Sequence, residues 1–182
     1  ARRGVDIPHV QGSFETNVPG IFIVGELGGM GLIRNALRQG RQAVAGIATR
    51  QQDPAPAGCV DVLVAGAGPA GLSASLSALE SGLSYVTVEQ EQPGGAVRHY
   101  PRQKLVMTAP MDIPLFGKVP MRQASKEQLL DLWHEVIGRT GLQVRAGERL
   151  LDVRREGDLF RATTTAGEHR ARHVVLAIGR RG

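Results

Sequence analysis

The sequence is short of cysteine, of aromatic residues and of long apolar runs, and each shortage excludes a class of protein. A single cysteine, Cys59, excludes an internal disulfide, a CxxC redox pair and a cysteine-based metal cluster within these 182 residues. Aromatic residues make up 4% of the chain, so we expect a mainly aliphatic core. The sequence has neither a signal-peptide pattern nor an apolar run long enough to cross a bilayer. Together with the lone thiol, this predicts a cytoplasmic protein.

Clusters of like charge are also missing. The formal net charge is +5, and the arginines that produce it are scattered along the chain. Scattered arginines are typical of a solvated surface, so we expect no nucleic-acid partner and no membrane partner. The histidines lack metal-ligand spacing, and no Ser–His–Asp or paired-carboxylate arrangement occurs, so we predict no metal and assign no catalytic residue.

What remains is 42% hydrophobic and contains 24 glycines, a composition typical of a globular protein with tight turns. Short apolar runs predict buried strands, and apolar residues at helical spacing predict helices. We expect strands over residues 20–25, 60–68, 84–90 and 142–147, and helices over residues 31–49, 69–82 and 125–141. Alternation over residues 149–179 predicts an antiparallel β-meander. The fold class is therefore α/β, a Rossmann-like doubly wound parallel sheet with helices on both faces and a small meander.

Three local features sharpen this expectation. Ser125 and Gln128 have the spacing of a capping box at a helix start. Gly40 lies inside a helical pattern, which favours close packing against another element. The proline-rich residues 91–124 are expected to be irregular, and a long irregular stretch in a compact domain commonly covers a ligand.

Three glycines spaced as G-x-G-x-x-G end the strand over residues 60–68 and open the next helix. Gly66 allows the tight turn, Gly68 lets the backbone approach a pyrophosphate, and Gly71 allows close packing of strand and helix. Pro69 and Ala70 lie inside the same turn, where free N–H groups of the helix N-terminus favour negative charge. The pattern predicts a dinucleotide site.

An acidic residue in the right place strengthens this prediction. Glu89 ends the next strand, where its carboxylate can accept hydrogen bonds from an adenosine ribose, and Gln90 follows it. A carboxylate there also repels a 2′-phosphate, which disfavours NADP at this site. Neither NAD nor FAD carries that phosphate, so Glu89 leaves the choice between them open.

Residues 16–26 resemble the second FAD signature of the flavin-dependent pyridine nucleotide oxidoreductases, with Thr16, four further residues and then the letters IFIVGE. In that family the acid after the glycine binds the flavin ribityl chain, and the next helix points its N-terminus at the flavin. The resemblance therefore implies FAD as cofactor. It assigns two groups of residues to the flavin end of the site, Gly25 with Glu26 and Gly31 with Leu32 and Ile33. Glu26 stands where the family usually has Asp.

Residues 61–182 resemble the first part of the thioredoxin-reductase-like flavoproteins of this superfamily, in the branch similar to bacillithiol disulfide reductase. The pieces that match include GAGPAGLSA, VTVEQ, YPRQKLVMTAP and VVLAIGRRG, the last of which contains Gly179. The resemblance implies that the loop after residue 95 runs near the flavin, where Tyr100 can stack or hydrogen-bond and Arg98 can offset negative charge. Lys104 and Asp112 share this positional argument. Ala70 stands where that branch often has cysteine, which argues against disulfide reduction by this segment.

The order of the two signatures is reversed. In this family the FAD domain is discontinuous, and its last part follows an inserted NAD(P)H domain. We divide the chain into residues 1–48, similar to that last part, a linker at 49–58, and residues 59–182, similar to the first part. Either the two parts form one circularly permuted FAD-binding domain, or they are the junction of two tandem modules completed elsewhere. A linker of this length spans up to roughly 33 Å, and we favour the permuted domain.

The sequence thus predicts the FAD-binding domain of a flavin-dependent NAD(P)H oxidoreductase, which passes electrons from a nicotinamide through the flavin to an acceptor. We expect the chain to be a piece of a longer polypeptide, with the NAD(P)H domain elsewhere in the parent chain. The alternative is a non-catalytic dinucleotide-binding or interaction module, and a flavin monooxygenase is a third interpretation because it shares the glycine turn. A homodimer is left open.

Overall fold

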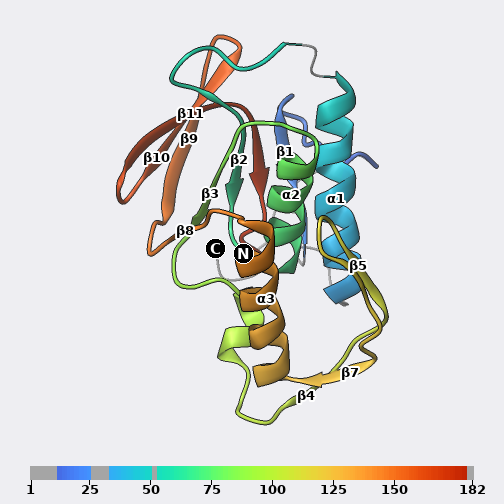
Figure 1. The fold of residues 1–182 in the computed structure, drawn as a ribbon. Coiled ribbons are helices and arrows are strands. Elements are labelled where there is room, and N and C mark those ends of the chain that lie inside the picture. The colour runs from blue at the N-terminus through green and yellow to red at the C-terminus, as the bar shows by residue number, and fades with distance from the viewer. Residues whose placement is uncertain (1–11, 26–32, 51–52, 180–182) are drawn as a thin grey trace, which may run out of the picture.

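The computed structural model describes residues 12–25, 33–50 and 53–179. Its strands in the main sheet are β1 (Ile21–Ile23), β2 (Val60–Ala65), β3 (Tyr85–Glu89), β8 (Arg145–Ala146), β9 (Leu150–Glu156), β10 (Leu159–Thr164) and β11 (Gly167–Leu176). Its helices are α1 (Ile33–Arg50), α2 (Pro69–Glu80) and α3 (Lys126–Thr140). The sheet runs in the order β8-β3-β2-β11-β10-β9, with β1 paired to β11 (Figure 1).

The sheet is parallel on one side and antiparallel on the other. Strands β8, β3, β2, β11 and β1 pair in parallel, whereas β11, β10 and β9 form the expected antiparallel meander. This confirms the predicted α/β, Rossmann-like fold class. Strand β8 is shorter than expected, and β2 ends at Ala65 because Gly66 turns the backbone to a φ of +103°.

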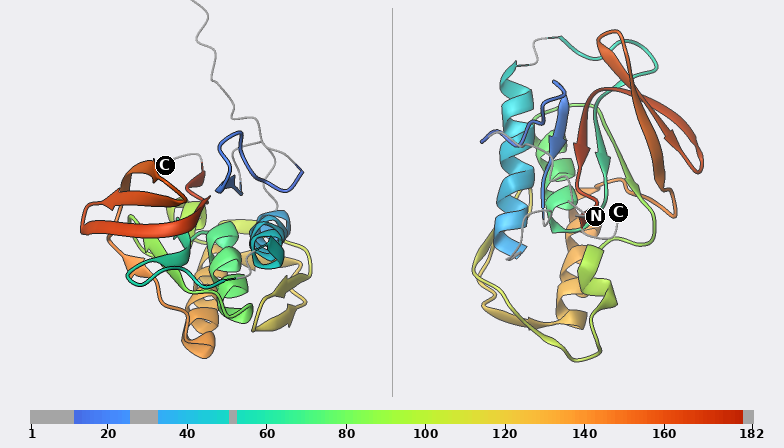
Figure 2. Two further views of the ribbon diagram at one scale, coloured as in Figure 1. Left: turned by 90° about the horizontal axis from the view of Figure 1, so that it is seen from above. Right: turned by 180° about the vertical axis from the view of Figure 1, so that it is seen from behind.

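Successive residues of β2 face opposite layers, as the pleat of a strand requires. Val62 and Val64 pack with residues of α1 and α2, whereas Leu63 packs with Phe160 and Ala162 of the meander. The meander, rather than a helix, therefore covers the face of β2 that α1 and α2 leave open. Figure 2 shows α1 and α2 lying side by side from both further directions.

The described residues before the linker pack directly on the residues after it. Strand β1 pairs with β11 in parallel, so that Ile21 is opposite Val174 and Ile23 is opposite Leu176. Helix α1 presents buried residues at helical spacing to α2, and Gly40 is one of them. A Cβ on Gly40 would overlap the carbonyl oxygen of Ala70 and lie 2.9 Å from the amide nitrogen of Ala74. The expected close packing at Gly40 is confirmed, and α2 is its partner.

Helix α3 begins where its sequence predicts. The Ser125 hydroxyl accepts a hydrogen bond from the Gln128 amide at 3.1 Å, and the Gln128 side chain accepts one from the Ser125 amide at 2.8 Å. The helix ends at Gly141, whose φ of 70° suits glycine. Among the helices of the described ranges, none is long and apolar enough to span a membrane.

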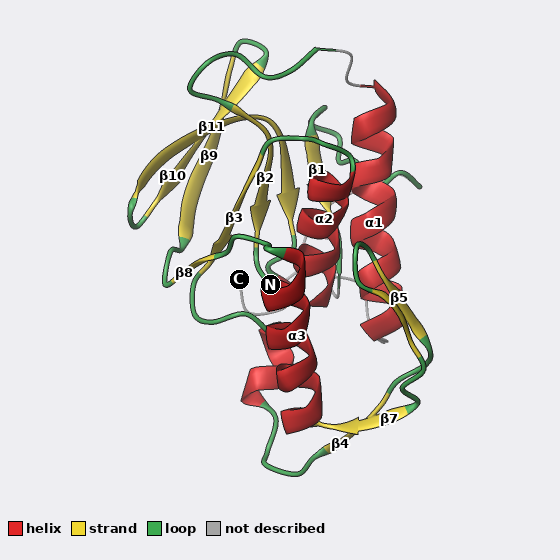
Figure 3. Cartoon of the chain, viewed as in Figure 1, coloured by secondary structure: helices red, strands yellow, loops and turns green. Residues whose placement is uncertain are grey.

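The expectation that residues 91–124 are irregular is wrong. This stretch contains a 3-10 helix η2 (Gly95–His99) and the strands β4 (Leu105–Met107), β5 (Met111–Ile113), β6 (Gly117–Val119) and β7 (Gln123–Ser125). Strand β4 pairs with β7, and β5 pairs with β6, in two small antiparallel sheets (Figure 3). Thr108 continues the first ladder, because its amide donates to the Arg122 carbonyl at 2.9 Å. Three of the prolines, Pro110, Pro114 and Pro120, lie between these short strands, and two others precede them.

The described part of the linker, residues 53–58, is held against the sheet. The Asp61 carboxylate accepts hydrogen bonds from the amides of Ala55 and Ser84 at 2.9 and 2.8 Å. Arg172 of β11 donates to the Pro54 carbonyl at 2.9 Å. Two strands of the sheet thus fix the path of the segment that joins α1 to β2.

The contact at Gly40 gives a test of the helix pair. Gly40→Ala should lower the free energy of unfolding by about 1–3 kcal/mol, because the new methyl overlaps the α2 backbone. Gly46→Ala, on the same helix with open space around its Cβ, should instead stabilise the protein by up to about 1 kcal/mol. Urea unfolding of both variants measures the difference, and equal effects would contradict this packing.

Candidate cofactor-binding site

A cavity of about 760 Å³ opens beyond the carboxyl ends of the parallel strands. Its walls include Ala65 at the end of β2, Glu89 at the end of β3, Ala177 just after β11 and Gly25 just after β1. Ligands of open α/β sheets bind in this position, and its volume is within the range of about 300–1,000 Å³ found for small-molecule sites. The location follows from the strand order, because parallel strands bring their carboxyl ends to one edge.

Most of the residues predicted from sequence line this cavity. Ten of them do so, namely Gly25, Ile33, Gly66, Gly68, Pro69, Ala70, Glu89, Gln90, Tyr100 and Gly179. Gly71 lies behind the wall, where a Cβ would overlap the Gly66 carbonyl, so it packs the turn. Glu26, Gly31 and Leu32 lie outside the described residues. The binding roles of the whole set stay predictions.

The glycine turn has the geometry that its spacing predicts. Gly66 has a φ of +103°, and a Cβ there would overlap the Ala177 carbonyl oxygen. At Gly68 the nearest atom to a Cβ, among the described residues, would be the Gly95 Cα at 3.4 Å, so this part of the chain tolerates a small side chain there. Steric restriction within the protein explains Gly66, whereas the reason predicted for Gly68, close approach of a pyrophosphate, stays a prediction.

The N-terminus of α2 faces the same region without a side-chain cap. Gly68 is the N-cap residue, Pro69 occupies the first helical position, and within the described part of the chain the helix start has no side-chain cap hydrogen bond. The first N–H groups of a helix need an acceptor from outside it, and the helix dipole favours an anion there. The described residues therefore fit a ligand whose phosphate groups reach the α2 N-terminus.

Glu89 is more engaged than the sequence predicts. Its side chain is 8% exposed, and its two carboxylate oxygens accept hydrogen bonds from the amides of Ala67 at 2.7 Å and Glu91 at 2.9 Å. These bonds fix the glycine turn to the loop after β3. Each carboxylate oxygen has a second lone pair, so the contact with a ribose predicted for Glu89 is compatible with both bonds.

The segment after β3 forms another part of the cavity wall. A turn at Gly94 and Gly95 packs on the glycine turn, with the Gly94 amide donating to the Ala67 carbonyl at 2.9 Å. Arg98, His99 and Tyr100 then line the cavity. The Lys104 ammonium lies 4.2 Å from the centre of the Tyr100 ring, behind this wall. Lys104 itself does not line the cavity.

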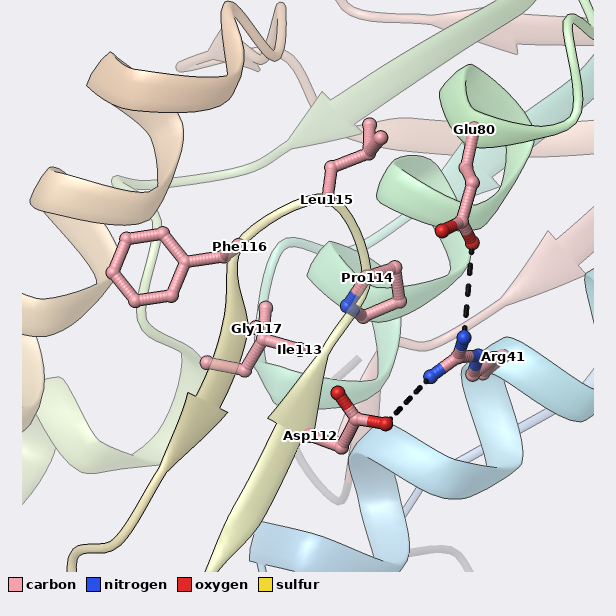
Figure 4. A pocket seen from close by; sticks show the side chains of 8 residues that line it. All are labelled: Arg41, Glu80, Asp112, Ile113, Pro114, Leu115, Phe116 and Gly117. Atoms are coloured by element: carbon pink, nitrogen blue, oxygen red, sulfur yellow. Dashed lines mark hydrogen bonds and ion pairs between the residues drawn. The ribbon is translucent and has the colours of Figure 1, made fainter.

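The positional argument for Asp112 is not supported by its location. Asp112 belongs to a separate surface hollow of about 360 Å³, where Arg41 lies between Asp112 and Glu80 (Figure 4). The Arg41 guanidinium is 3.1 Å from the Asp112 carboxylate and 3.9 Å from that of Glu80. Asp112 therefore links α1 to the β5–β6 hairpin rather than facing the cavity.

Sequence reasoning missed two parts of the site. Residues 148–151, which lead from the loop after β8 into the start of β9, line the end of the cavity near Glu89. The sequence carries little sign of their position, because backbone hydrogen bonds, which do not depend on residue type, bring them to the cavity. The Gly147 amide donates to the Glu91 carbonyl and the Glu148 amide donates to the Glu89 carbonyl, both at 2.9 Å. Gln39, which bonds the Gly25 amide, was also missed, since it lies on a helix distant in sequence.

Charged groups around the cavity are unevenly paired. The Glu91 carboxylate is 3.1 Å from His99, and the Glu148 carboxylate is 2.6 Å from His169. Within the described ranges, Arg98 and Arg149 line the cavity without an ion pair. The carboxylates are therefore engaged by protein groups. The Arg98 guanidinium donates one hydrogen bond to the Pro93 carbonyl at 3.5 Å, and both guanidinium groups keep further donors for an anionic ligand. No group of three or more metal-ligating side chains occurs among the described residues.

Glu148 is 5% exposed, and several partners surround its carboxylate. Burial alone would raise the pKa of Glu148, but hydrogen bonds to Thr164 and His169, and the charges of His169 and Arg145, outweigh it and hold the pKa below its usual range. The Thr164 hydroxyl is 2.6 Å from the carboxylate. Glu148 thus joins the wall of the cavity to the meander as an anion.

Comparison with known proteins gives a consistent result. Residues 63–181 match the family described as pyridine nucleotide-disulphide oxidoreductase. A ferredoxin–NADP reductase of Thermus thermophilus is 34% identical over 121 residues, which cover 65% of this chain and 33% of that protein. The chain thus spans about a third of the length of the curated relatives it matches.

Solved structures point the same way. A bacillithiol disulfide reductase of Staphylococcus aureus has a TM-score of 0.59 and 26% identity, over 66% of this chain and 38% of that one. A flavin-containing monooxygenase of Stenotrophomonas maltophilia has a TM-score of 0.58 and 28% identity, over 66% and 38% of the two chains. Proteins with three different named activities therefore share this part of the fold.

The state of Glu148 predicts a pH dependence of stability. Because its folded pKa is lowered, Glu148 stabilises the fold fully above its unfolded pKa, and this contribution is lost as the pH falls through the folded value. Glu148→Gln should cost about 1–3 kcal/mol at neutral pH and flatten the acid limb of the stability curve. Urea unfolding between neutral pH and about pH 3 measures both effects. Glu135→Gln, at an exposed position of α3, controls for the loss of one negative charge, and an identical loss in both variants would refute the role of Glu148.

Proposed function

The chain belongs to the pyridine nucleotide-disulphide oxidoreductase family, and from that premise we propose that it forms the FAD-binding part of a flavin-dependent oxidoreductase. One observation carries the proposal. Gly25, from the FAD signature over residues 16–26, and Ile33, from the helix after it, line the same cavity as the glycine turn and Glu89. A cavity with both signatures in its walls supports a ligand that has a nucleotide at one end and a flavin at the other.

The proposed roles follow the cavity from end to end. Residues 66–70 and the N-terminus of α2 would hold the pyrophosphate, with Arg98 as a counter-charge. Glu89 and Gln90 would bind the adenosine ribose. Gly25, Ile33 and Tyr100 would form the flavin end, together with Glu26, Gly31 and Leu32 by sequence. Gly179 would close the wall after β11.

Bound FAD would supply the redox chemistry, accepting a hydride from a nicotinamide and delivering electrons to an acceptor. The residues of this chain would bind, orient and shield it. No described residue is assigned a proton-transfer or nucleophilic role. Cys59 lies immediately before β2 and does not line the cavity, so disulfide reduction by a thiol of this chain is not part of the proposal.

We further propose that the two segments form one FAD-binding domain in permuted order. The parallel pairing of β1 with β11, the packing of Gly40 on α2, and the fixed path of residues 53–58 support it. The linker carries the chain from α1 to β2, so neither signature needs a second copy of the chain. In the alternative, a junction of two tandem modules, each signature would find its partner elsewhere.

We propose that the nicotinamide-binding domain and the binding site for the electron acceptor lie in sequence outside this chain. The chain spans about a third of its curated relatives, which leaves most of their length for other parts. The similar proteins are a ferredoxin–NADP reductase, a bacillithiol disulfide reductase and a flavin-containing monooxygenase. A shared cofactor domain, combined with different acceptor sites, accounts for such a range.

Flavin binding by the purified chain tests the proposal directly. The chain should take up FAD and show a flavin absorbance spectrum, and denaturation should release FAD rather than FMN. A folded, colourless protein that rejects added FAD would sink the proposal and favour the tandem junction. A flavoprotein that a nicotinamide cannot reduce, even within its full parent polypeptide, would favour a non-catalytic module.

The contrast between two glycines provides a sharper test. Gly68→Ala should weaken FAD binding about tenfold or more, because its methyl projects where the pyrophosphate would approach. It should change the free energy of unfolding by no more than about 0.5 kcal/mol, since the nearest protein atom is 3.4 Å away. Gly66→Ala should destabilise the fold by about 1–3 kcal/mol, because its φ is +103°. Calorimetric FAD titration and urea unfolding separate the two effects.

A further inference from the structure

The turn that follows β1 is held from behind by a single side chain. The Gly25 amide donates a hydrogen bond to the Oε1 atom of Gln39 at 2.8 Å. Gly25 lines the cavity and has a φ of +91°, whereas Gln39 lies on α1 and is not part of the cavity wall. Within the described ranges, the hydrogen bond to Gly25 is what connects the Gln39 side chain to the wall of the cavity.

Helix α1 holds Gln39 in a fixed place relative to the glycine turn. The next residue, Gly40, packs so closely on Ala70 that a Cβ would overlap its carbonyl oxygen. Ser73 of α2 donates a buried hydrogen bond of 2.6 Å to the Leu37 carbonyl of α1. Residues on both sides of Gln39 along α1, Leu37 and Gly40, are thus held against the helix that the glycine turn opens.

Two consecutive peptide groups at the end of β1 are held in place as a result. The Val24 amide donates to the Leu176 carbonyl of β11 at 3.0 Å, and the Gly25 amide donates to Gln39. A peptide group is planar, so fixing consecutive amides fixes the direction in which the chain leaves β1. Without Gln39 the Gly25 N–H would lose the partner that orients it, and an unpaired, part-buried N–H is costly.

We propose that Gln39 is a positioning residue that holds the Gly25 turn in register with the glycine turn, so that one extended ligand can contact both. This inference rests on the proposed function, because it concerns the flavin end of the same FAD site. It goes beyond the signatures themselves, neither of which includes Gln39. It also separates the site into two parts, a nucleotide end that does not depend on Gln39 and a flavin end that does.

Two probes distinguish these parts. ADP occupies only the nucleotide end, at the glycine turn and Glu89, whereas FAD extends to Gly25. Gln39→Leu, which keeps the bulk but removes the acceptor, should weaken FAD binding about tenfold and leave ADP binding within about twofold of the parent. Gln39→Glu keeps an acceptor oxygen and should restore most of the FAD affinity. Gln42→Leu, at an exposed position of α1, should change neither affinity.

The experiment is calorimetric titration of each variant with FAD and with ADP, supported by the visible circular dichroism of the bound flavin, which Gln39→Leu should alter. Equal FAD affinity in Gln39→Leu and the parent would overturn the inference. So would parallel losses of FAD and ADP affinity, because they indicate a general loss of folding. A parent protein that binds neither probe would instead refute the proposed function, so the two failures are distinguishable.

Discussion

Strand β11 is the constraint on which the site depends. Its first half pairs with β10 in the meander, and its second half lies between β2 and β1 in the parallel part of the sheet. The glycine turn follows β2, the Gly25 turn follows β1, and the chain beyond β11 supplies Ala177 and Gly179. One strand therefore sets the spacing between the two signatures and connects both to the meander, whose side chains hold Glu148 in the cavity wall.

Local sequence signals predicted local structure well. The capping box at Ser125 and the glycine turn after β2 depend on residues a few positions apart, and the structure has both. The helical pattern around Gly40 predicts close packing there, but it does not indicate that Ala70 is the residue contacted. The segment over residues 91–124 was misjudged because its strands are only three residues long, too short for alternation to be visible among the prolines.

The parts of the site that sequence missed are those assembled over long separations. Gln39 reaches Gly25 because α1 folds back along β1, and no spacing rule connects the two residues. Glu148 is similar, since its partners Thr164 and His169 belong to the meander. Its backbone bond to Glu89 brings it to the cavity. Motifs describe what a ligand touches, whereas such residues hold the motifs in place. Such a residue needs only to hydrogen-bond a neighbouring protein group, and several residue types can do so. Its identity in the sequence therefore does not predict its role.

The fixed path of residues 53–58 has a consequence for how the site assembles. A strand of three residues and one helix bury too little to associate tightly with the sheet as a separate peptide. A short tether turns that association into an intramolecular step, with an effective concentration on the order of millimolar. If the two segments form one domain as proposed, completion of the cavity would be independent of how dilute the protein is, and the reversed order of the segments would have no entropic disadvantage compared with a continuous domain.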